Sequence, residues 1–492
     1  MTARVLMVQG TASGVGKSLV VAALCRIFAR RGVRVLPFKA QNISNNAAVT
    51  RSGGEIGRAQ ALQARAAGVE PDVRMNPVLV KPLGNARSEV VVLGRGDPSM
   101  DALPWDARRD RLWPVVTHAV AELRATADLV IVEGAGSPAE INLRSRDFVN
   151  MAVARETEAP VLVVADMERG GAFAALYGTW ALVDDAERRH LRGFLLNRFR
   201  GDAALLTSGL AELRERTGVP VLGVIPLLPN LLPEEDAATL GARGAGRVAI
   251  AAVCFPHVAN FDDLDPLASE PGVAVRWVEG PEGLQDAAAI VLPGSRNTLA
   301  DLRWLWETGL GAAVRARAAA GLPVVGLCGG YQMLGREVSD PLGVEAGGST
   351  PGLGLLDLRT TLEGSKQVRL VSVRVVAPDG AFASLRGHTI DGYEIHHGET
   401  SIGAGTVVWF ESARKPLGAG RGSVWGTYLH GFFANDQARR AWLGALNGEC
   451  TTPTPAWATR LDAEVDRIAD AVAAALDLDA VMQLIEQGVP CA

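Results

Sequence analysis

The sequence of 492 residues has no uninterrupted apolar stretch of the roughly 18 residues that a membrane-spanning helix requires. It has only five cysteines, which lie far apart and form no CxxC pair, so a disulfide framework and a zinc site are both excluded. The net charge is −5 with acidic and basic residues interspersed, which argues against a nucleic-acid-binding surface. No basic segment followed by an apolar one precedes the first strand-like run. We therefore expect a cytoplasmic protein with neither a membrane nor a nucleic acid as partner.

The composition is that of a globular protein with more than one domain. Hydrophobic residues make up 48% and charged residues 21% of the chain, and its length exceeds what one hydrophobic core usually supports. Residues 227–246 contain several prolines and glycines, which indicates a linker. We predict a first domain over 1–232, a linker over 233–246, a second domain over 247–440 and a helical extension over 441–492. The sequence leaves both a monomer and a homo-oligomer open.

Short β-branched runs alternate with amphipathic helical stretches in both halves, which predicts parallel α/β sheets. The expected strands of the first half are 5–8, 33–38, 129–132, 161–165, 193–196 and 221–225, with a helix over 18–31. A similar series in the second half covers 248–253, 274–278, 289–292 and 324–327. Later runs, at 368–376, 406–410 and 423–428, have the pattern of antiparallel or edge strands, and a terminal helical stretch covers 462–487.

A glycine-rich loop lies between the first strand and the first helix, where a phosphate-binding loop must lie. Its glycines allow backbone N–H groups to close on phosphate oxygens, a lysine reaches the β- and γ-phosphates, and a serine hydroxyl binds Mg²⁺. The alternative is a glycine-rich turn with an exposed lysine. Five residues rather than four separate the first and last glycines, as in the dethiobiotin-synthetase-like branch of P-loop ligases, which this loop resembles. The predicted ATP-binding residues are Gly10, Thr11, Gly14, Gly16, Lys17 and Ser18.

Polar residues follow two further strands of the first half, at the edge where parallel strands bind ligands. Lys39 opens the run Lys-Ala-Gln-Asn-Ile-Ser-Asn-Asn, which is expensive to bury without a polar ligand, and we add Lys39 to the ATP-binding set. Glu133 ends the third strand and, with Ser18, is suited to Mg²⁺ and its waters. Asp147 is a second acidic candidate for the metal. Capping and turn chemistry is the alternative for Asn45, Glu133 and Asp147.

A cysteine in the second half lies on a sharp turn between a hydrophobic strand and a helix. In Gly326-Leu-Cys328-Gly329-Gly the small neighbours permit the strained turn of a nucleophile elbow, and the helix N-terminus favours a thiolate. A buried structural cysteine is the alternative. Cysteine catalysis needs a base within hydrogen-bond reach. His430, directly after a strand, is the best candidate, and His396 and His397 are its competitors.

The segment Leu-Pro-Gly294-Ser-Arg comes at a strand end before the elbow and is expected to supply an oxyanion N–H together with Gly329. These features resemble the class I glutamine amidotransferases. In many of those enzymes a glutamate lies two residues after the catalytic histidine, whereas this sequence has Phe432 there. We therefore expect the third member of the triad to be absent, as is common in the cobyric/cobyrinic branch.

Several longer runs narrow the resemblance to the cobyric acid synthase family. They are Phe-Lys-Ala-Gln-Asn-Ile-Ser-Asn-Asn at 38–46, Gly-Glu-Ile-Gly-Arg-Ala-Gln at 54–60 and Met-Asn-Pro-Val-Leu-Val-Lys-Pro at 75–82. The resemblance implies an ATP- and Mg²⁺-dependent amidoligase that takes glutamine and a corrinoid polycarboxylate as substrates. It implies four amidations of adenosylcobyrinic acid a,c-diamide, at the b, d, e and g carboxylates, through acyl phosphates. The candidate substrate contacts are Gln41, Asn42, Asn45, Arg58, Gln60, Asn76 and Lys81, with Arg87 as a further guess.

Three rival interpretations stay open. The first is an amidoligase of the same architecture that acts on another polycarboxylate, as in cobyrinic acid a,c-diamide formation. The second is a P-loop switch ATPase of the partitioning kind, although such a switch has no use for a glutaminase. The third is a degenerate amidotransferase domain kept only for packing.

Overall fold

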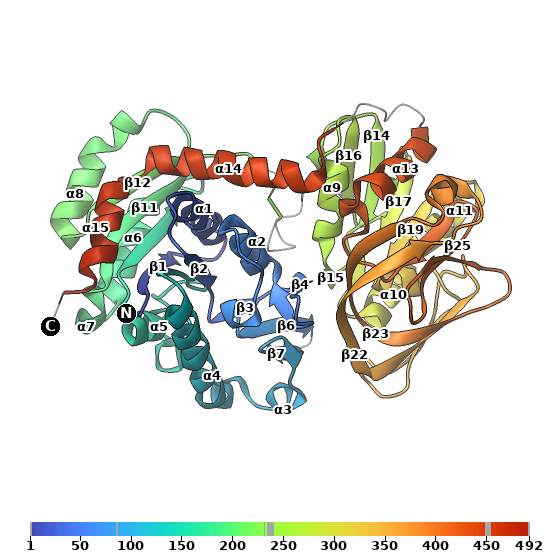
Figure 1. Ribbon diagram of the computed structural model, residues 1–492, viewed down its shortest axis with the longest axis horizontal. Coiled ribbons are helices and arrows are strands. Elements are labelled where there is room, and N and C mark those ends of the chain that lie inside the picture. The colour runs from blue at the N-terminus through green and yellow to red at the C-terminus, as the bar shows by residue number, and fades with distance from the viewer. Residues whose placement is uncertain (1, 85–86, 231, 234–240, 448–453, 491–492) are drawn as a thin grey trace.

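The computed structural model describes residues 2–84, 87–230, 232–233, 241–447 and 454–490, and it has two α/β halves (Figure 1). The N-terminal half is built on a six-stranded parallel sheet in the order β12-β11-β10-β1-β9-β2. All six strands were expected from the sequence. Their bounds are Arg4–Gly10 for β1, Val35–Phe38 for β2, Leu129–Glu133 for β9, Val161–Asp166 for β10, Leu191–Phe199 for β11 and Val221–Pro226 for β12.

Both faces of this sheet are covered, because successive side chains of a strand point to opposite sides. Leu6 and Val8 of β1 belong to a core with α1 (Lys17–Arg30), whereas Val5 and Met7 belong to a core on the other face. The second core is formed with α4 (Trp105–Thr126), α5 (Met151–Thr157), α6 (Ala172–Leu182) and α8 (Thr207–Thr217). Continuous apolar strands such as β10 are buried along their whole length, as parallel sheets require.

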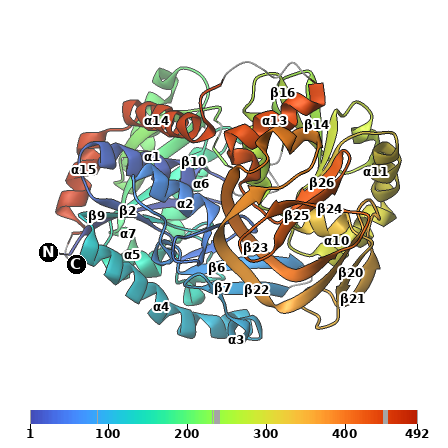
Figure 2. The ribbon, with the colours of Figure 1, turned by 45° about the vertical axis from the view of Figure 1, so that its right-hand side comes forward.

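Short strands that the sequence analysis did not anticipate lie between β2 and α4. One small sheet has the order β3-β6-β7-β8, and β4 pairs with β5. β3, β4 and β5 have only three residues each, which is too short to show a periodic pattern. Ala47 of β4 and Leu79 of β6 pack against Tyr393 and Ile395 of the other half, and Figure 2 shows β6 and β7 beside β22 and β23. The bounds are Gln41–Ile43, Ala47–Val49, Glu55–Gly57, Val78–Gly84, Arg87–Val92 and Arg95–Gly96 for β3 to β8, and Arg58–Ala66 for α2.

The C-terminal half contains a mixed twelve-stranded sheet in the order β13-β16-β14-β17-β19-β26-β25-β24-β22-β20-β21, with β23 paired to β22. Its short outer strands are β13 (Arg243–Gly244), β20 (Glu337–Asp340) and β21 (Gly348–Pro351). β26 was expected to be an antiparallel or edge strand, but it lies inside the sheet, parallel to β19 and antiparallel to β25. The fold class predicted from the sequence is confirmed. The bounds are Val248–Val253 (β14), Val273–Val278 (β16), Ala289–Leu292 (β17), Val324–Leu327 (β19), Leu358–Val375 (β22), Thr389–Ile402 (β23), Val407–Glu411 (β24), Pro416–Arg421 (β25), Val424–Thr427 (β26), Thr298–Glu307 (α10) and Leu310–Ala319 (α11).

The C-terminal segment returns to the first half. The terminal helical stretch was expected to be one helix, but it consists of two, α14 (Trp457–Ala475) and α15 (Leu478–Gln487). They follow α13 (Asp436–Asn447) and meet at Leu476. Figure 1 shows α14 spanning the two halves, and Arg26 of α1 forms ion pairs with Asp462 and Asp466 of α14. Of the predicted linker, residues 234–240 lie outside the described part of the chain. No helix among the described residues is long and apolar enough to cross a membrane.

Candidate active site

Cys328 occupies a strained turn between β19 and α12 (Gly329–Met333). Its backbone has φ 51° and ψ −109°, a conformation that a residue with a side chain rarely adopts and that is typical of functional positions. The neighbouring glycines are required by close packing: a Cβ at Gly330 would lie 1.9 Å from the carbonyl oxygen of Leu292, and one at Gly326 would lie 2.5 Å from that of Gly330. The sequence therefore produces the elbow that the motif predicts.

The imidazole of His430 is held by a carboxylate that the sequence analysis missed. His430 Nδ1 lies 2.7 Å from Asp263 Oδ2, and Gly431 N–H donates to Asp263 Oδ1 at 2.7 Å. The expectation that the third triad member is absent is therefore wrong. Phe432 is indeed no acid, but the chain supplies one from the 3₁₀ turn Phe261–Leu264, 167 residues before the histidine. A rule based on local spacing cannot find a partner so distant in sequence.

The electrostatic setting distinguishes His430 from its two competitors. Burial alone would lower the pKa of His430, but Asp263 and Cys328 favour the imidazolium and raise the pKa to about 10. Burial lowers the pKa of His396, which contacts Glu394 at 3.1 Å and stacks on the Tyr428 ring. Burial and the nearby cation of Lys366 lower the pKa of His397 to about 4. The geometry therefore favours His430 as the base for Cys328.

The candidate oxyanion residues meet beside the elbow. A Cβ at Gly329 would lie 2.9 Å from the backbone N of Ser295, and one at Gly294 would lie 3.7 Å from His430 Cε1. Gly294 is positioned by β18 (Gly294–Ser295), which pairs with β15 (Val258–Ala259). These backbone groups line the same small cavity as Cys328 and His430, of about 40 Å³. An oxyanion formed at the cysteine would therefore have backbone N–H groups within this cavity.

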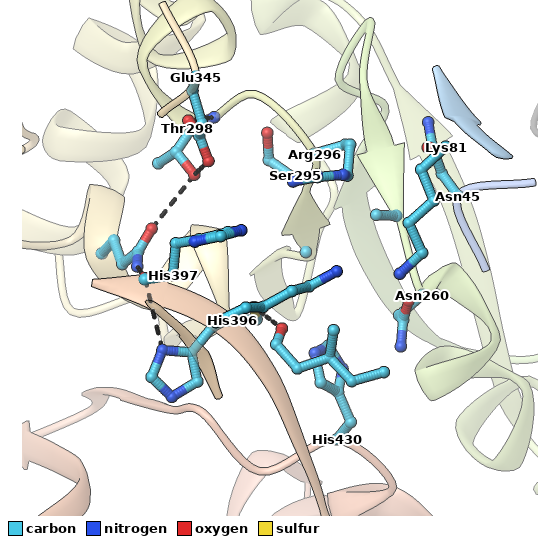
Figure 3. Close-up of a pocket in the computed structure, with 17 residues that line it drawn as sticks. Asn45, Lys81, Asn260, Ser295, Arg296, Thr298, Glu345, His396, His397 and His430 are labelled. Atoms are coloured by element: carbon cyan, nitrogen blue, oxygen red, sulfur yellow. Dashed lines mark hydrogen bonds between the residues drawn. The ribbon is translucent and has the colours of Figure 1, made fainter. Parts of the chain in front are cut away.

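The cavity is lined by both halves of the chain. Asn45 and Lys81 come from the N-terminal half, and Figure 3 shows them across the cavity from Glu345 and Thr298. Glu345 accepts from Thr298 N–H at 2.6 Å, and burial raises its pKa to about 7. Gln332 donates to the carbonyl of His397 at 3.0 Å. Glu345 and Gln332 were not predicted. Gln332 had a signal, since it lies one helical turn after Cys328.

A buried group of charged residues joins the two halves next to this cavity. Lys366 of β22 lies 2.5 Å from Glu55 and 3.0 Å from Glu89, and Arg296, just after the oxyanion residues, also pairs with Glu89. Lys81 pairs with Glu55, and burial lowers its pKa to about 8. Because no member is more than about one-eighth exposed, these pairs are poorly screened by water. We call these five residues the interdomain ion cluster.

In the N-terminal half the glycine-rich loop lies at the end of β1, and its glycines are conformationally required. Gly14 and Gly16 have φ values of 71° and 96°, and a Cβ at Gly10 would lie 2.6 Å from Val15 Cγ2. Thr11 N–H donates to the carbonyl of Val164 at 2.9 Å, which fixes the loop to β10. Lys17 Nζ donates to the carbonyls of Ala12 at 2.9 Å and Gly136 at 3.1 Å, so its cation lies over the loop.

Glu133 gathers polar groups from three segments at this edge of the sheet. Its Oε1 accepts from Ser18 Oγ and Lys39 Nζ, each at 2.8 Å, and its Oε2 accepts from Gln63 Nε2 at 2.5 Å. Ser18 and Glu133 are the oxygen donors that Mg²⁺ takes. Among the described residues no group of three or more His, Cys, Asp or Glu is placed to hold a metal ion. Mg²⁺ bound here would take its other ligands from phosphate and water. These residues fit a Mg–nucleotide, and Gln63 is an addition to the predicted set.

Two further polar residues support the nucleotide loop and its surroundings. Asn197, at the end of β11, donates to the carbonyl of Val15 at 2.8 Å and was not predicted. Asp147 accepts three backbone N–H bonds, from Val149, Asn150 and Ala152, at 2.8–2.9 Å. Both of its carboxylate oxygens thus cap the start of α5, which is the capping role left open for this residue.

The predicted substrate contacts divide into two groups. Asn76 is committed to the backbone of Gly57, Lys39 and Val78, and Arg58 is paired with the other half. Asn42 donates to Gln60 Oε1 at 3.1 Å. By contrast, Gln41 Oε1, Asn45 Oδ1 and Gln60 Nε2 are buried atoms without a hydrogen-bond partner among the described residues. Arg87 donates to the carbonyl of Glu345, across the interface.

Comparisons with known proteins agree with this arrangement. Residues 6–239 match the model of the CobQ/CobB/MinD/ParA nucleotide binding domain, and residues 249–438 match that of the CobB/CobQ-like glutamine amidotransferase domain. A cobyric acid synthase of Desulforudis audaxviator is 48% identical over 96% of this chain and 97% of that protein. One of Deinococcus radiodurans is 49% identical over 97% of this chain and 100% of that protein. With such identity along nearly its whole length, the chain belongs to the cobyric acid synthase family.

Proposed function

We propose that the chain is an adenosylcobyric acid synthase, which uses ATP and glutamine to amidate the b, d, e and g carboxylates of adenosylcobyrinic acid a,c-diamide. One observation carries this proposal: Asn45 and Lys81 of the nucleotide-binding half line the cavity of Cys328 and His430. A glutaminase that opens onto a phosphate-binding domain is explained by one reaction, in which ammonia released at the first site is consumed at the second. Family membership supports the cobalamin pathway as its place.

In the glutaminase, the Cys328 thiolate attacks the side-chain amide carbon of glutamine. Backbone N–H groups at Gly294 and Gly329 stabilise the resulting oxyanion, and His430 donates its proton to the leaving ammonia. Water then attacks the thioester and gives a proton to His430, which releases glutamate and restores the Cys328 thiolate beside the charged imidazole. Asp263 keeps the imidazole oriented and charged through its 2.7 Å contact with Nδ1.

In the synthetase, a substrate carboxylate oxygen attacks the γ-phosphorus of ATP, and ADP leaves. A free carboxylate is a poor electrophile at neutral pH, and the acyl phosphate supplies the leaving group that it lacks. Ammonia attacks the acyl carbon, phosphate departs, and the nitrogen loses a proton to give the amide. Lys17 holds the β- and γ-phosphates, and Mg²⁺ bound with Ser18 and Glu133 would neutralise the charge on the transferred phosphoryl group.

Family membership supports a corrinoid as the substrate. In addition, three buried atoms support the binding of a polar ligand in the N-terminal half. Gln41 Oε1, Asn45 Oδ1 and Gln60 Nε2 have no partner among the described residues, and such atoms cost free energy unless a ligand or water pairs with them. We therefore expect Gln41, Asn45 and Gln60 to contact substrate amide or carboxylate groups. Lys81 and Asn76, which are held by protein partners, are weaker candidates.

Mass spectrometry of adenosylcobyrinic acid a,c-diamide incubated with the purified protein, glutamine, ATP and Mg²⁺ tests the proposal. We expect four successive conversions of a carboxyl to an amide, all of which require ATP. Hydrolysis of ATP and glutamine without any change in the corrinoid would retain the ligase chemistry and discard this substrate in favour of another polycarboxylate. ATP hydrolysis that is indifferent to both glutamine and corrinoid would favour a nucleotide switch.

A further inference from the structure

Arg58 belongs to the nucleotide-binding half, but its head group lies in the amidotransferase half. It is the first residue of α2, and its Nε is 2.7 Å from Asp262 Oδ2. The guanidinium also donates to the hydroxyl of Tyr393 and lies 5.4 Å from the centroid of that ring. The side chain is 22% exposed, so these contacts are only partly screened by water. A role in binding the corrinoid would require Arg58 to give up these partners.

Both partners of Arg58 lie close to the His430 imidazole, Asp262 through its chain neighbour Asp263 and Tyr393 through direct contact. Asp262 immediately precedes Asp263, which holds His430 Nδ1. Tyr393 stacks on the His430 ring at 5.2 Å between centroids, with an angle of 19° between the planes. The backbones of Tyr393 and His430 exchange two hydrogen bonds, of 2.9 Å and 3.2 Å. Arg58 therefore contacts Tyr393 directly, and it contacts Asp262, the chain neighbour of the acid that holds His430.

A second contact also joins the nucleotide-binding half to Tyr393 and to the turn of Asp262 and Asp263. Asn260 Nδ2 donates to the carbonyl of Ala47 in β4 and to the hydroxyl of Tyr393, each at 3.1 Å. Asn260 has φ 49°, and the turn that carries Asp262 and Asp263 begins directly after it. The turn that supplies the triad acid is thus attached to the nucleotide-binding half at Asn260, which precedes it, and at Asp262.

Loss of the Arg58 charge would disturb this turn for an electrostatic reason. Burial raises the pKa of Asp262, and Arg58 opposes that rise. Without Arg58, a buried carboxylate would lie unpaired next to Asp263, and the Tyr393 hydroxyl would keep only one of its two donors, Asn260. Unpaired buried charges are relieved by protonation or by movement toward water, and either would displace the acid that orients His430.

We propose that Arg58 is a positioning residue of the glutaminase, supplied by the nucleotide-binding half to hold the turn of Asp262 and Asp263 and the ring of Tyr393 against His430. The proposal rests on the assignment of Cys328 and His430 as the glutaminase pair. It makes the glutaminase incomplete without the synthetase half. Arg58 does not touch glutamine in this scheme, so it affects the rate of the reaction and not the binding of that substrate.

The test compares Arg58→Ala and Arg58→Lys in the full chain, with Arg65→Ala as the matched control. Arg65 lies on the same helix, but it pairs with Asp462 of α14 through two contacts of 2.8 Å and not with the turn of Asp262 and Asp263. We expect Arg58→Ala to lower kcat for glutamine hydrolysis roughly 10- to 100-fold at unchanged KM, the scale of a small misplacement of reacting groups. Arg58→Lys keeps the charge near Asp262 and should recover part of the rate, and Arg65→Ala should match the wild type.

Ammonia-dependent amidation of the corrinoid separates positioning from substrate contact. It should survive in Arg58→Ala, because the synthetase chemistry does not use the triad. Wild-type glutamine hydrolysis in Arg58→Ala, or an equal loss in Arg65→Ala, would overturn the proposal. Loss of ammonia-dependent amidation with intact glutamine hydrolysis would instead make Arg58 a corrinoid contact.

Two further measurements keep the result interpretable. Tyr393→Phe removes the hydroxyl that Arg58 and Asn260 contact while it keeps the ring on His430, so it should lower kcat in the same direction even if Arg58→Ala unfolds in thermal denaturation. An unchanged rate in Tyr393→Phe, together with an unfolded Arg58→Ala, would contradict the proposal. Glutamine hydrolysis is assayed without corrinoid, so the ranking of the variants can be read even if the wild type amidates no corrinoid.

Discussion

In the amidotransferase half the reacting groups already lie together without a ligand, whereas in the nucleotide-binding half the polar groups bind one another. Cys328 is held by a strained turn, and His430 already contacts Asp263 at 2.7 Å. At the other site Ser18, Lys39 and Gln63 all converge on Glu133, and Lys17 donates to backbone carbonyls. In the proposed mechanism these contacts are exchanged for contacts to phosphate and Mg²⁺ when the nucleotide binds. The first site is therefore preorganised, and the second is organised by its ligand.

The largest expected effect is that of removing Cys328, the nucleophile of the glutaminase. Cys328→Ala should abolish glutamine hydrolysis and glutamine-dependent amidation, because no other group can form the thioester. Amidation with ammonium salts should continue at the wild-type rate, since the synthetase does not use the thiol. Cys254→Ala, a half-buried cysteine outside the cavity, is the matched control and should retain both activities. Loss of the ammonia-dependent reaction in a folded Cys328→Ala variant would argue against separate sites.

The second prediction concerns the opposite site. Lys17→Ala removes the cation that is proposed to hold the β- and γ-phosphates, and loss of one such charge costs on the order of 10²- to 10³-fold in kcat. We expect the amidation rate to fall by this factor with either glutamine or ammonia as nitrogen donor, as measured by product formation. Basal glutamine hydrolysis should persist. A variant that retains amidation would show that the loop does not bind the reacting nucleotide.

The third prediction concerns the acid that the sequence analysis missed. Asp263→Asn should lower kcat for glutamine hydrolysis by at least about 100-fold, because the imidazole loses the partner that fixes its tautomer and charge. The pKa of His430, raised to about 10 in the native chain, should fall when the negative charge is removed. The alkaline limb of the pH–rate profile should therefore move to lower pH. A profile that keeps its alkaline limb would indicate that Asp263 does not determine the charge of His430.

The difference between the two sites also explains which residues could be predicted from sequence. Lys17, Ser18 and Cys328 lie in short motifs whose backbone geometry is set by adjacent residues, and Glu133 follows from the rule that parallel strands end at one edge. Asp263 could not be found in this way, because it reaches His430 from 167 residues away. Gln63 and Glu345 are likewise brought to their sites only by tertiary packing. The three-residue strands β3, β4 and β5 were missed because they are too short to show a periodic pattern.

Arg58 and Lys81 are two motif residues whose partners could not be predicted from the sequence. Their position in a polar family motif made both candidates for substrate binding, yet each is paired with a carboxylate at the interface, Arg58 with Asp262 and Lys81 with Glu55. A cationic residue in a motif can bind the ligand or hold the two halves together at the site. Only the position of its partner distinguishes these two roles. Contacts at the interface between the halves therefore account for two motif residues that the sequence analysis assigned to substrate binding.

The last expected effect is on stability and not on activity, and it tests whether the two sites form one structural unit. Lys366→Met removes the central cation of the interdomain ion cluster and leaves Glu55 and Glu89 buried with less compensation. Breaking a buried pair from one side costs about 3–5 kcal/mol of unfolding free energy, and the change should appear as a lower thermal midpoint at neutral pH. Lys415→Met, which removes a more exposed pair with Glu399, should change stability by less than about 1 kcal/mol.

The pH dependence of that difference identifies its cause. Although burial opposes it, the cations of Lys366 and Arg296 hold the pKa of Glu89 well below its usual range. A depressed carboxyl pKa stabilises the native chain above the unfolded pKa, and this stabilisation is lost as the pH falls through the folded pKa. In Lys366→Met the carboxylates protonate more readily, which relieves the unpaired charge, so the gap in thermal midpoint to the wild type should narrow on acidification. A gap that stays constant with pH would assign the loss to side-chain packing and not to the charge of the cluster.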